Sequence, residues 1–331
     1  MRETVIRMTP KPHSELLVAS CTPDGGVYRY RLADDGTLTE IGKMPMPSPM
    51  FLECSGNRLY VVLRAPFDET GDSGIAVYDL DTGMRIGDVA STRGEVACHL
   101  AVMDGDVYCA NYISGSVSLL GGACDVHVGH GVDPARQESP HVHSTFLSPD
   151  GHYVLSCDLG LDTIFVYDRA LKPVSTARVP DGAGARHLTF SKDGRYVYCM
   201  NEMSATVSIF AYEDGQLFYL SDISVKPAGF TGQGKGSAIK LTMDGTHLYV
   251  SERGSETIAL LRVDGAVLTP LAHFETHGKE PRDFTLLKDE RYAVCTNQFE
   301  NSIALYRVNG DRTLVYLRSY ELPAPLCAVE V

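Results

Sequence analysis

One stretch decides the fold of this chain: HLTFSKDGRYVYCMNEMSATVSIFAY, residues 187–212. It holds two apolar runs joined by a Lys-Asp-Gly turn and a third run after an Asn- and Ser-containing link; QLFYLSDI (216–223) supplies a fourth run. Alternation with a period of two is typical of half-buried strands, and Asp-Gly between two such runs is a hairpin signal. The stretch therefore predicts four consecutive antiparallel strands.

The same unit recurs along the whole chain. Other copies begin at residues 15, 50, 99, 143, 238 and 283. The residue equivalent to Tyr198 falls at Leu17, Tyr60, Tyr108, Leu155, Tyr198, Tyr249 and Val294, at intervals of 43 to 51 residues. Seven copies at this period predict an all-β, seven-bladed β-propeller with four-stranded antiparallel blades, forming one domain over residues 1–331. No segment longer than a few residues has helical periodicity, so helix should be nearly absent.

The first copy lacks its own innermost strand, and two segments compete for that place. One is LCAVEV (326–331) and the other is TVIRMT (4–9). The link before LCAVEV resembles the links between other copies, so we expect the C-terminal strand to close the ring and remove an open edge. Residues 121–142 and 225–237 do not fit the repeat and are predicted to be long, functional loops.

Composition excludes several classes of function. The net charge of −13 argues against a nucleic-acid partner, because phosphate binding needs a basic surface. No apolar run approaches the ~20 residues of a membrane span, and the N-terminus lacks the apolar core of a secretory signal. The nine cysteines are odd in number and none are spaced C-x-x-C. We therefore expect a cytoplasmic protein without a membrane partner, either a monomer or a weak homo-oligomer.

The repeat also predicts where a site should lie. In each blade the innermost strand runs beside the central axis and the second strand runs antiparallel to it. The start of the first and the end of the second therefore meet at one mouth of the ring. The residues at these positions are Arg64, His99, Tyr112, His141, His143, Asp158, Arg186, His187, Asn201, Glu202, Ser237, Glu252, Arg253, Arg282, Asp283, Asn297 and Gln298.

This set is unusually polar for an acidic chain. Its four arginines suit carboxylate or phosphate, and Glu202 and His143 add groups for acid–base chemistry. Such residues can also be solvated or form structural ion pairs. A metal site is a rival interpretation, because His127, His130, His141, His143 and Asp158 have H-x-x-H and H-x-H spacings. No G-x-S-x-G or strand-linked G-x-G-x-x-G motif indicates a serine nucleophile or a dinucleotide cofactor.

The stretch GAGARHLTFSKDGRYVYCMNEMSATVSIF (182–210) resembles the G-x-G-P-R-H and N-E segment of the seven-bladed β-propeller lactonase family. That family includes a bacterial 6-phosphogluconolactonase and a fungal carboxymuconate cyclase. HVHSTFLSPDG, SAIKLTMDGTHLYVSERG and KEPRDFTLLKDERYAVCTNQ are similar to its other segments, and the likeness spans residues 15–331. The chain departs from the pattern at Ala185, where the family has proline, and in the His-rich loop 121–142.

The resemblance implies a lactone hydrolase, closest to the 6-phosphogluconolactonase branch of the pentose phosphate pathway, with no metal or other cofactor. It implies catalytic roles for His143, Arg186, Glu202 and Arg253. We expect the small anionic sugar lactone to bind Arg282, Arg64, Tyr112, Asp158, Asn201, Gln298 and Lys235. Arg186 would stabilise the oxyanion, and either His143 or Glu202 would be the base. A lactonising cyclase acting on a dicarboxylate and a non-catalytic binding platform remain as alternatives.

Overall fold

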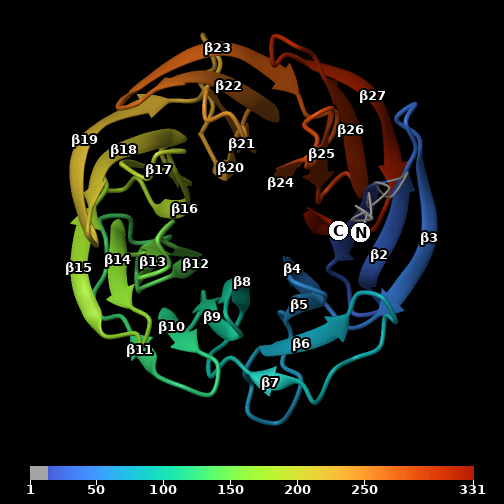
Figure 1. The fold of residues 1–331 in the computed structure, drawn as a ribbon. Helices are drawn as coiled ribbons and strands as arrows, with labels where there is room; N and C mark the ends of the chain where they lie inside the picture. The colour runs from blue at the N-terminus through green and yellow to red at the C-terminus, as the bar shows by residue number, and fades with distance from the viewer. Residues whose placement is uncertain (1–13) are drawn as a thin grey trace, which may run out of the picture.

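Seven four-stranded antiparallel sheets stand around a central axis in the computed structural model, which describes residues 14–331 (Figure 1). The innermost strands are β28 (Pro325–Glu330), β4 (Pro49–Ser55), β8 (Ala97–Met103), β12 (Val142–Leu147), β16 (Ala185–Phe190), β20 (Gly236–Leu241) and β24 (Pro281–Leu286). The second strands are β1 (Ser14–Ser20), β5 (Arg58–Leu63), β9 (Asp106–Asn111), β13 (Tyr153–Asp158), β17 (Tyr196–Asn201), β21 (His247–Glu252) and β25 (Tyr292–Asn297).

Two further strands complete each blade. The third strands are β2 (Gly26–Leu32), β6 (Gly74–Asp79), β10 (Ser116–Leu119), β14 (Thr163–Asp168), β18 (Thr206–Glu213), β22 (Thr257–Asp264) and β26 (Ser302–Val308). The outer strands are β3 (Leu38–Pro45), β7 (Ala90–Ser91), β11 (Cys124–Val126), β15 (Pro173–Arg178), β19 (Gln216–Ser224), β23 (Val267–Glu275) and β27 (Leu314–Glu321). The predicted seven-bladed architecture is confirmed, and residues 14–331 contain no helix, hence none that could cross a membrane.

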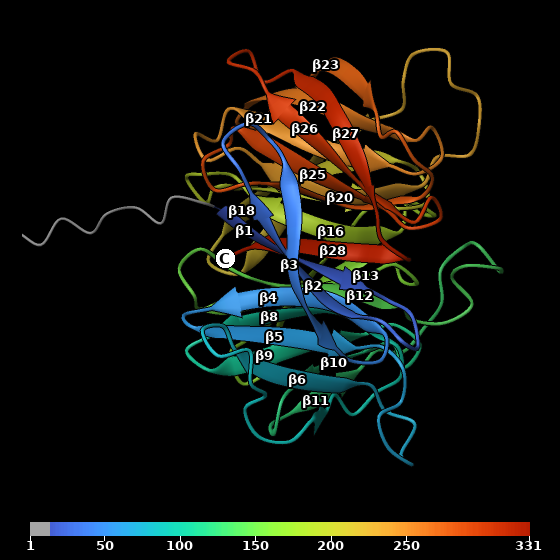
Figure 2. The same ribbon diagram turned by 90° about the vertical axis from the view of Figure 1, so that its right-hand side faces the viewer.

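The first blade combines the two ends of the described chain. Its strand order is β28-β1-β2-β3, and Leu17 pairs with Val329 (Figure 2). This confirms that the C-terminal strand closes the ring, as the sequence predicted. The competing segment 4–9 lies outside the described residues. None of the nine cysteines forms a disulfide.

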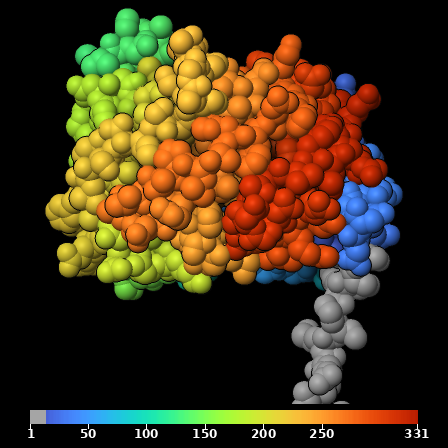
Figure 3. All heavy atoms as spheres, turned by 90° about the horizontal axis from the view of Figure 1, so that it is seen from above, coloured from blue at the N-terminus to red at the C-terminus, as the bar shows by residue number. Residues whose placement is uncertain are grey.

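The two predicted loops need one correction. Within 121–142, residues Cys124–Val126 form β11, the outer strand of the third blade, so only residues 127–141 connect blades as a loop. Residues 225–235 connect β19 to β20. The loop 127–141 precedes β12 and the loop 225–235 precedes β20, so both lie at the mouth where innermost strands begin. Figure 3 shows both loops, green and yellow, rising above the same side of the ring.

The hydrophobic core lies between neighbouring blades rather than at the axis. The seven repeat-equivalent residues of the second strands are all buried, from Leu17 to Val294. The hydroxyls of Tyr108, Tyr198 and Tyr249 donate to backbone oxygens of the next blade at 2.9, 2.8 and 2.5 Å. A buried phenol needs such a partner, so these bonds join the third, fifth and sixth blades to the blades that follow them, in addition to the apolar contacts.

Every innermost strand is irregular near its start. In six blades one residue is inserted there relative to the second strand: Leu326, Met50, Cys98, His143, Arg186 and Arg282. In the remaining blade the irregularity spans Ser237 and Ala238. A β-bulge leaves one residue unpaired and redirects its side chain. All six inserted residues line cavities at the mouth of the ring where the innermost strands begin.

Candidate active site

The predicted meeting of strand starts and strand ends is seen in the register. Val142 pairs with Asp158 and Ala185 pairs with Asn201, so these ends share one mouth of the ring, here called the site mouth. A cavity of about 140 Å³ opens there, lined by Met50, Arg64, Val96, Cys98, Tyr112, Arg136, His143, Glu202 and Arg282. A smaller cavity of about 20 Å³, lined in part by Arg186 and His187, shares His143 and Arg282 with it.

Glu202 is the centre of the site mouth. It follows β17, and its carboxylate is 4% exposed. Oε2 lies 2.6 Å from Nη2 of Arg253 and 3.0 Å from Nε of Arg186, while Oε1 accepts from Nη2 of Arg136 at 2.7 Å. Burial opposes ionisation, but these guanidinium groups hold the pKa of Glu202 well below its usual range. The carboxylate is therefore ionised at neutral pH and is a weak base.

Arg253 is held by a second carboxylate. Its Nη1 donates to Oε1 of Glu280 at 2.9 Å and its Nη2 donates to the Gly236 carbonyl at 2.9 Å. Lys235 donates to the same Oε1 of Glu280 at 2.7 Å. Nε of Arg253 is buried and has no hydrogen-bond partner among residues 14–331. Arg253 therefore fixes Glu202 in place and retains one unused donor.

His143 is buried and partly unsatisfied. Its Nε2 lies 4.0 Å from Oε2 of Glu202, and its Nδ1 has no partner among residues 14–331. Burial, with the nearby charge of Arg186, lowers the pKa of His143 well below 6.5. The imidazole is neutral at pH 7, so one ring nitrogen can accept a proton. A buried polar atom without a partner is costly, which indicates that a ligand or water completes this site.

Arg282 is a cation of the site mouth without a partner among residues 14–331. Its guanidinium makes no ion pair or hydrogen bond with any of residues 14–331, and it lines both cavities. Burial and repulsion from Arg253 lower its pKa. Arg64, exposed at the rim, also has no carboxylate partner in the described chain. The site mouth gathers five arginines and Lys235 around Glu202 and Glu280, a positive excess suited to an anion.

The structure divides the predicted residues into two groups. His143, Arg186, Glu202 and Arg253 contact one another, and Arg282, Arg64 and Tyr112 line the cavity beside them. Lys235 reaches this group only through Glu280. Asp158, Asn201 and Gln298 do not line the cavity, and Gln298 lies half-buried beyond β25.

Asp158 and Asn201 have structural roles instead. Asp158 is fully buried, accepting from the His127 ring at 2.6 Å and the His141 amide at 2.8 Å. Asn201 donates to the hydroxyls of Thr206 and Ser208. The last residue of the second strand is a fully buried polar residue in five blades: Asn111, Asp158, Asn201, Glu252 and Asn297. The residue that directly follows the second strand faces the cavity instead. In the second, third and fifth blades this residue is Arg64, Tyr112 and Glu202.

Sequence reasoning missed Arg136 and Glu280. Arg136 lies in the loop 127–141, which is anchored by Gln137: its side-chain amide donates to Leu159 O at 2.9 Å and Asp162 Oδ1 at 2.8 Å. No local motif indicates that this loop brings Arg136 next to Glu202. Glu280 does have a signal, since it stands two residues before Arg282 in KEPRDF, within a segment that carries the family resemblance.

Two histidines of the metal interpretation, His127 and His141, are engaged by protein groups. His127 bonds Asp158 through Nδ1 and the Tyr167 hydroxyl through Nε2 at 2.7 Å, and His141 stacks on Tyr112 at 4.5 Å. In the described part of the chain, no group of three or more His, Cys, Asp or Glu residues is arranged to hold a metal ion.

This ring of seven blades, with an arginine-rich site at one mouth, belongs to a known class of proteins. Residues 15–329 match the family described as "Lactonase, 7-bladed beta-propeller", and the chain is a member of that family. It is 28% identical to the 6-phosphogluconolactonase of Bacillus subtilis, over 91% of this chain and 93% of that one. An uncharacterised protein of Lactococcus lactis subsp. cremoris is 33% identical over the same shares.

Solved structures agree. The periplasmic gluconolactonase of Pseudomonas aeruginosa superposes with a TM-score of 0.88 at 28% identity, covering 96% of this chain and 99% of that one. A protein from Lactobacillus plantarum superposes with a TM-score of 0.89 at 29% identity, with the same coverage.

Proposed function

We propose that this protein hydrolyses 6-phospho-D-glucono-1,5-lactone to 6-phosphogluconate, a step of the pentose phosphate pathway. The observation that carries the proposal is Arg282, a half-buried guanidinium without a partner among residues 14–331, beside a neutral His143 with an unused nitrogen. An unpaired cation next to a free base suits an anionic ester better than a neutral one. The name of the Bacillus relative and the family match point to the same chemistry.

In the proposed reaction His143 is the base. Its free nitrogen takes a proton from water while the water oxygen bonds to the lactone carbonyl carbon. The oxyanion that forms is stabilised by Arg186, which lines the cavity beneath His143. The oxyanion then collapses, the bond to the ring oxygen breaks, and the His143 imidazolium returns the proton to that oxygen. The carboxylic acid formed ionises and releases one proton.

Glu202 is assigned a different role from His143. Its carboxylate is held by three guanidinium groups, whereas Nδ1 of His143 has no partner among residues 14–331. Glu202 is therefore less well placed than His143 to accept a proton from water. It positions Arg186 and Arg253 and balances part of their charge. The choice between two bases that the sequence left open therefore falls on His143.

The phosphate is assigned to Arg282 and Arg64, with Arg136 at the rim. Among residues 14–331, Arg136 keeps part of its guanidinium free, because only its Nη2 bonds Glu202. Arg253 and Lys235 are less suited to the phosphate, because Glu202 and Glu280 occupy both Nη atoms of Arg253 and the Lys235 ammonium. A phosphorylated substrate also fits a cytoplasmic location, as do nine cysteines without a disulfide.

The proposal is tested by hydrolysis of freshly generated 6-phosphogluconolactone, followed by acid release and corrected for spontaneous opening. We expect kcat/KM at least about tenfold above that for unphosphorylated gluconolactone, since an added charge-assisted contact contributes about 1.5–3 kcal/mol. A chelator should leave the rate unchanged. Equal values of kcat/KM would remove the phosphate from the proposal, and rates at background for both lactones would refute it.

A further inference from the structure

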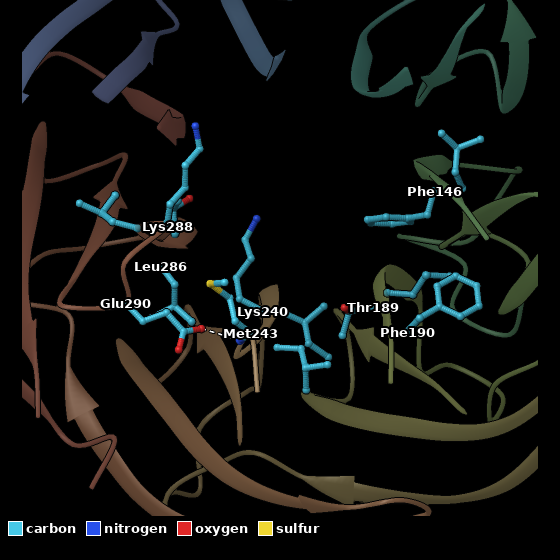
Figure 4. A pocket seen from close by; sticks show the side chains of 14 residues that line it. Phe146, Thr189, Phe190, Lys240, Met243, Leu286, Lys288 and Glu290 are labelled. Carbon is cyan, nitrogen blue, oxygen red and sulfur yellow. Dashed lines mark hydrogen bonds between the residues drawn. The ribbon is translucent and has the colours of Figure 1, made fainter. Parts of the chain in front are cut away.

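A second cavity, of about 870 Å³ and here called the wide cavity, lies at the mouth of the ring opposite the site mouth (Figure 4). We call that opposite mouth the wide mouth. It is bounded by the ends of β12, β16, β20 and β24 and by the turns that follow β20 and β24. Its wall is mainly apolar: Phe146, Leu188, Phe190, Ile239, Leu241 and Leu286. The volume falls within the roughly 300–1,000 Å³ of ordinary small-molecule pockets.

This cavity is separate from the candidate active site. No lining residue is common to the two. Rings on the innermost strands fill the space between them: His99 lies 4.1 Å from Phe51, 4.8 Å from Phe146 and 5.1 Å from His187, between ring centroids. Phe146 lines the wide cavity, and His187 lines the small cavity beneath His143. A molecule in the wide cavity would therefore not be the distal part of a substrate bound at the site mouth.

Two lysines give this apolar cavity its charge. Figure 4 shows Lys240 and Lys288 extending from the wall into the open space, with Phe146 opposite. The Lys288 ammonium has no ion pair within residues 14–331, and the Lys240 ammonium lies 3.7 Å from Asp283, a loose contact. In a protein with a net charge of −13, one ammonium without an ion pair among the described residues and one held only loosely leave this cavity open to an anion.

The nearby carboxylates are engaged by other groups. Asp283 accepts from the amides of Phe284 and Ala328. Glu330 accepts from the Lys288 backbone amide. Glu290 is engaged, because it accepts from the Met243 amide at 2.5 Å and from Nη1 of Arg312 at 2.6 Å. Burial raises the pKa of Glu53 to about 7, so this carboxyl carries only part of a negative charge at neutral pH. The cavity therefore keeps a positive end next to an apolar wall.

We propose that this cavity is a second binding site, for a small carboxylic acid with an aromatic or branched aliphatic body. The carboxylate would bind between Lys240 and Lys288, and the body would cover the wall formed by Phe190, Leu241 and Leu286. Inorganic anions lack the apolar body, and neutral apolar molecules lack the charge, so neither uses both halves of the site. The proposal does not depend on the reaction assigned to the site mouth.

The test uses 4-phenylbutyrate as the probe, with the full chain, by isothermal titration. Lys240→Gln combined with Lys288→Gln should raise its dissociation constant about tenfold, as expected for two partly exposed charge pairs. Lys172→Gln, on an exposed turn of the fourth blade, is the matched control and should leave binding unchanged. Arg282→Gln should also leave it unchanged, which separates this site from the site mouth.

Two further probes divide the contributions. The uncharged 4-phenylbutyramide should bind about tenfold more weakly than the acid, and butyrate should bind more weakly than phenylbutyrate. The proposal is overturned if no binding is detected at about 10 mM probe, near the limit of useful affinity. It is equally overturned if the amide matches the acid, or if binding is lost with Arg282→Gln and kept in the double lysine variant.

Discussion

The two mouths of this ring are built from the same innermost strands and yet differ in character. At the site mouth each strand begins with a bulge, and the inserted residues include His143, Arg186 and Arg282. At the wide mouth the same strands end in regular pairing, with Phe146, Phe190 and Leu286 on the wall. A bulge interrupts the alternation of side chains along a strand. Side chains that regular alternation would place between the blades therefore point to the axis. The bulge thus separates a charged candidate site from an apolar cavity.

The sharpest test of this division is Arg186→Ala. Loss of an oxyanion donor costs about 100- to 1,000-fold in kcat, and we expect a loss in this range for 6-phosphogluconolactone with a smaller change in KM. Arg195, on the same blade but exposed and paired with Asp193, is the matched control, and Arg195→Ala should keep full activity. If Arg186→Ala folds and retains kcat, the oxyanion assignment is wrong.

Replacement of the proposed base should have the next largest effect. His143→Ala is expected to lower kcat at least about 100-fold, the lower range for a general base, and to abolish the acidic limb of the pH–rate profile. His152→Ala, at an exposed turn, is the control. An acidic limb that survives in His143→Ala but disappears in Glu202→Gln would transfer the base role to Glu202.

Glu202→Gln should mainly lower the free energy of unfolding. Removal of the charge leaves Arg136, Arg186 and Arg253 without their common partner, and breaking a buried ion pair costs about 3–5 kcal/mol. The free energy of unfolding in urea should fall accordingly. Asp193→Asn, which breaks an exposed pair with Arg195, should cost less than about 1 kcal/mol. Similar losses in the two variants would show that the Glu202 cluster is not a buried network.

Arg282→Ala should act on binding rather than on turnover. A contact made equally in the ground and transition states changes KM and leaves kcat. We expect KM for the phosphorylated lactone to rise about 10- to 100-fold, and KM for gluconolactone to change little. Arg136→Ala, whose side chain is 40% exposed, should have a smaller effect of the same kind. A fall in kcat without a change in KM would place Arg282 at the reacting carbon instead.

The smallest expected effect is that of one axial histidine on the pH dependence of the free energy of unfolding. Burial lowers the pKa of His99, His143 and His187 well below 6.5, so the unfolded chain binds more protons than the folded one below that value. Their contribution to stability is complete above about pH 6.5 and is lost as the pH falls through the folded pKa values, by at most about 1.4 kcal/mol per pH unit for each histidine. His99→Phe should reduce the slope of unfolding free energy against pH by the contribution of one histidine.

That slope is measured by urea unfolding between about pH 4 and 7. His152→Gln, at an exposed side chain, should leave it unchanged. Stability that is independent of pH in this range would show that the three axial histidines are hydrated and titrate normally.

Local sequence signals were sufficient for the ring. The period of the repeat, the alternation within each run and the Asp-Gly turns depend on neighbours in the chain, so seven blades followed from them. The turns at Gly151, Gly194 and Gly245 indeed have positive φ values of 72°, 72° and 76°. Closure by LCAVEV also followed, because the link that precedes it repeats a pattern found between other blades.

The site divides in the same way. The sequence by itself determined which mouth carries the polar residues, and it brought His143, Arg186, Glu202 and Arg253 forward by position and motif. It did not separate Asp158 and Asn201, which close turns inside their blades, from the residue one position later, which faces the cavity. Nor did it indicate Arg136, whose loop returns to Glu202 across 66 residues of chain. Which way a side chain turns at a strand end, and where a loop folds back, depend on hydrogen bonds to distant partners, so only the tertiary structure decided them.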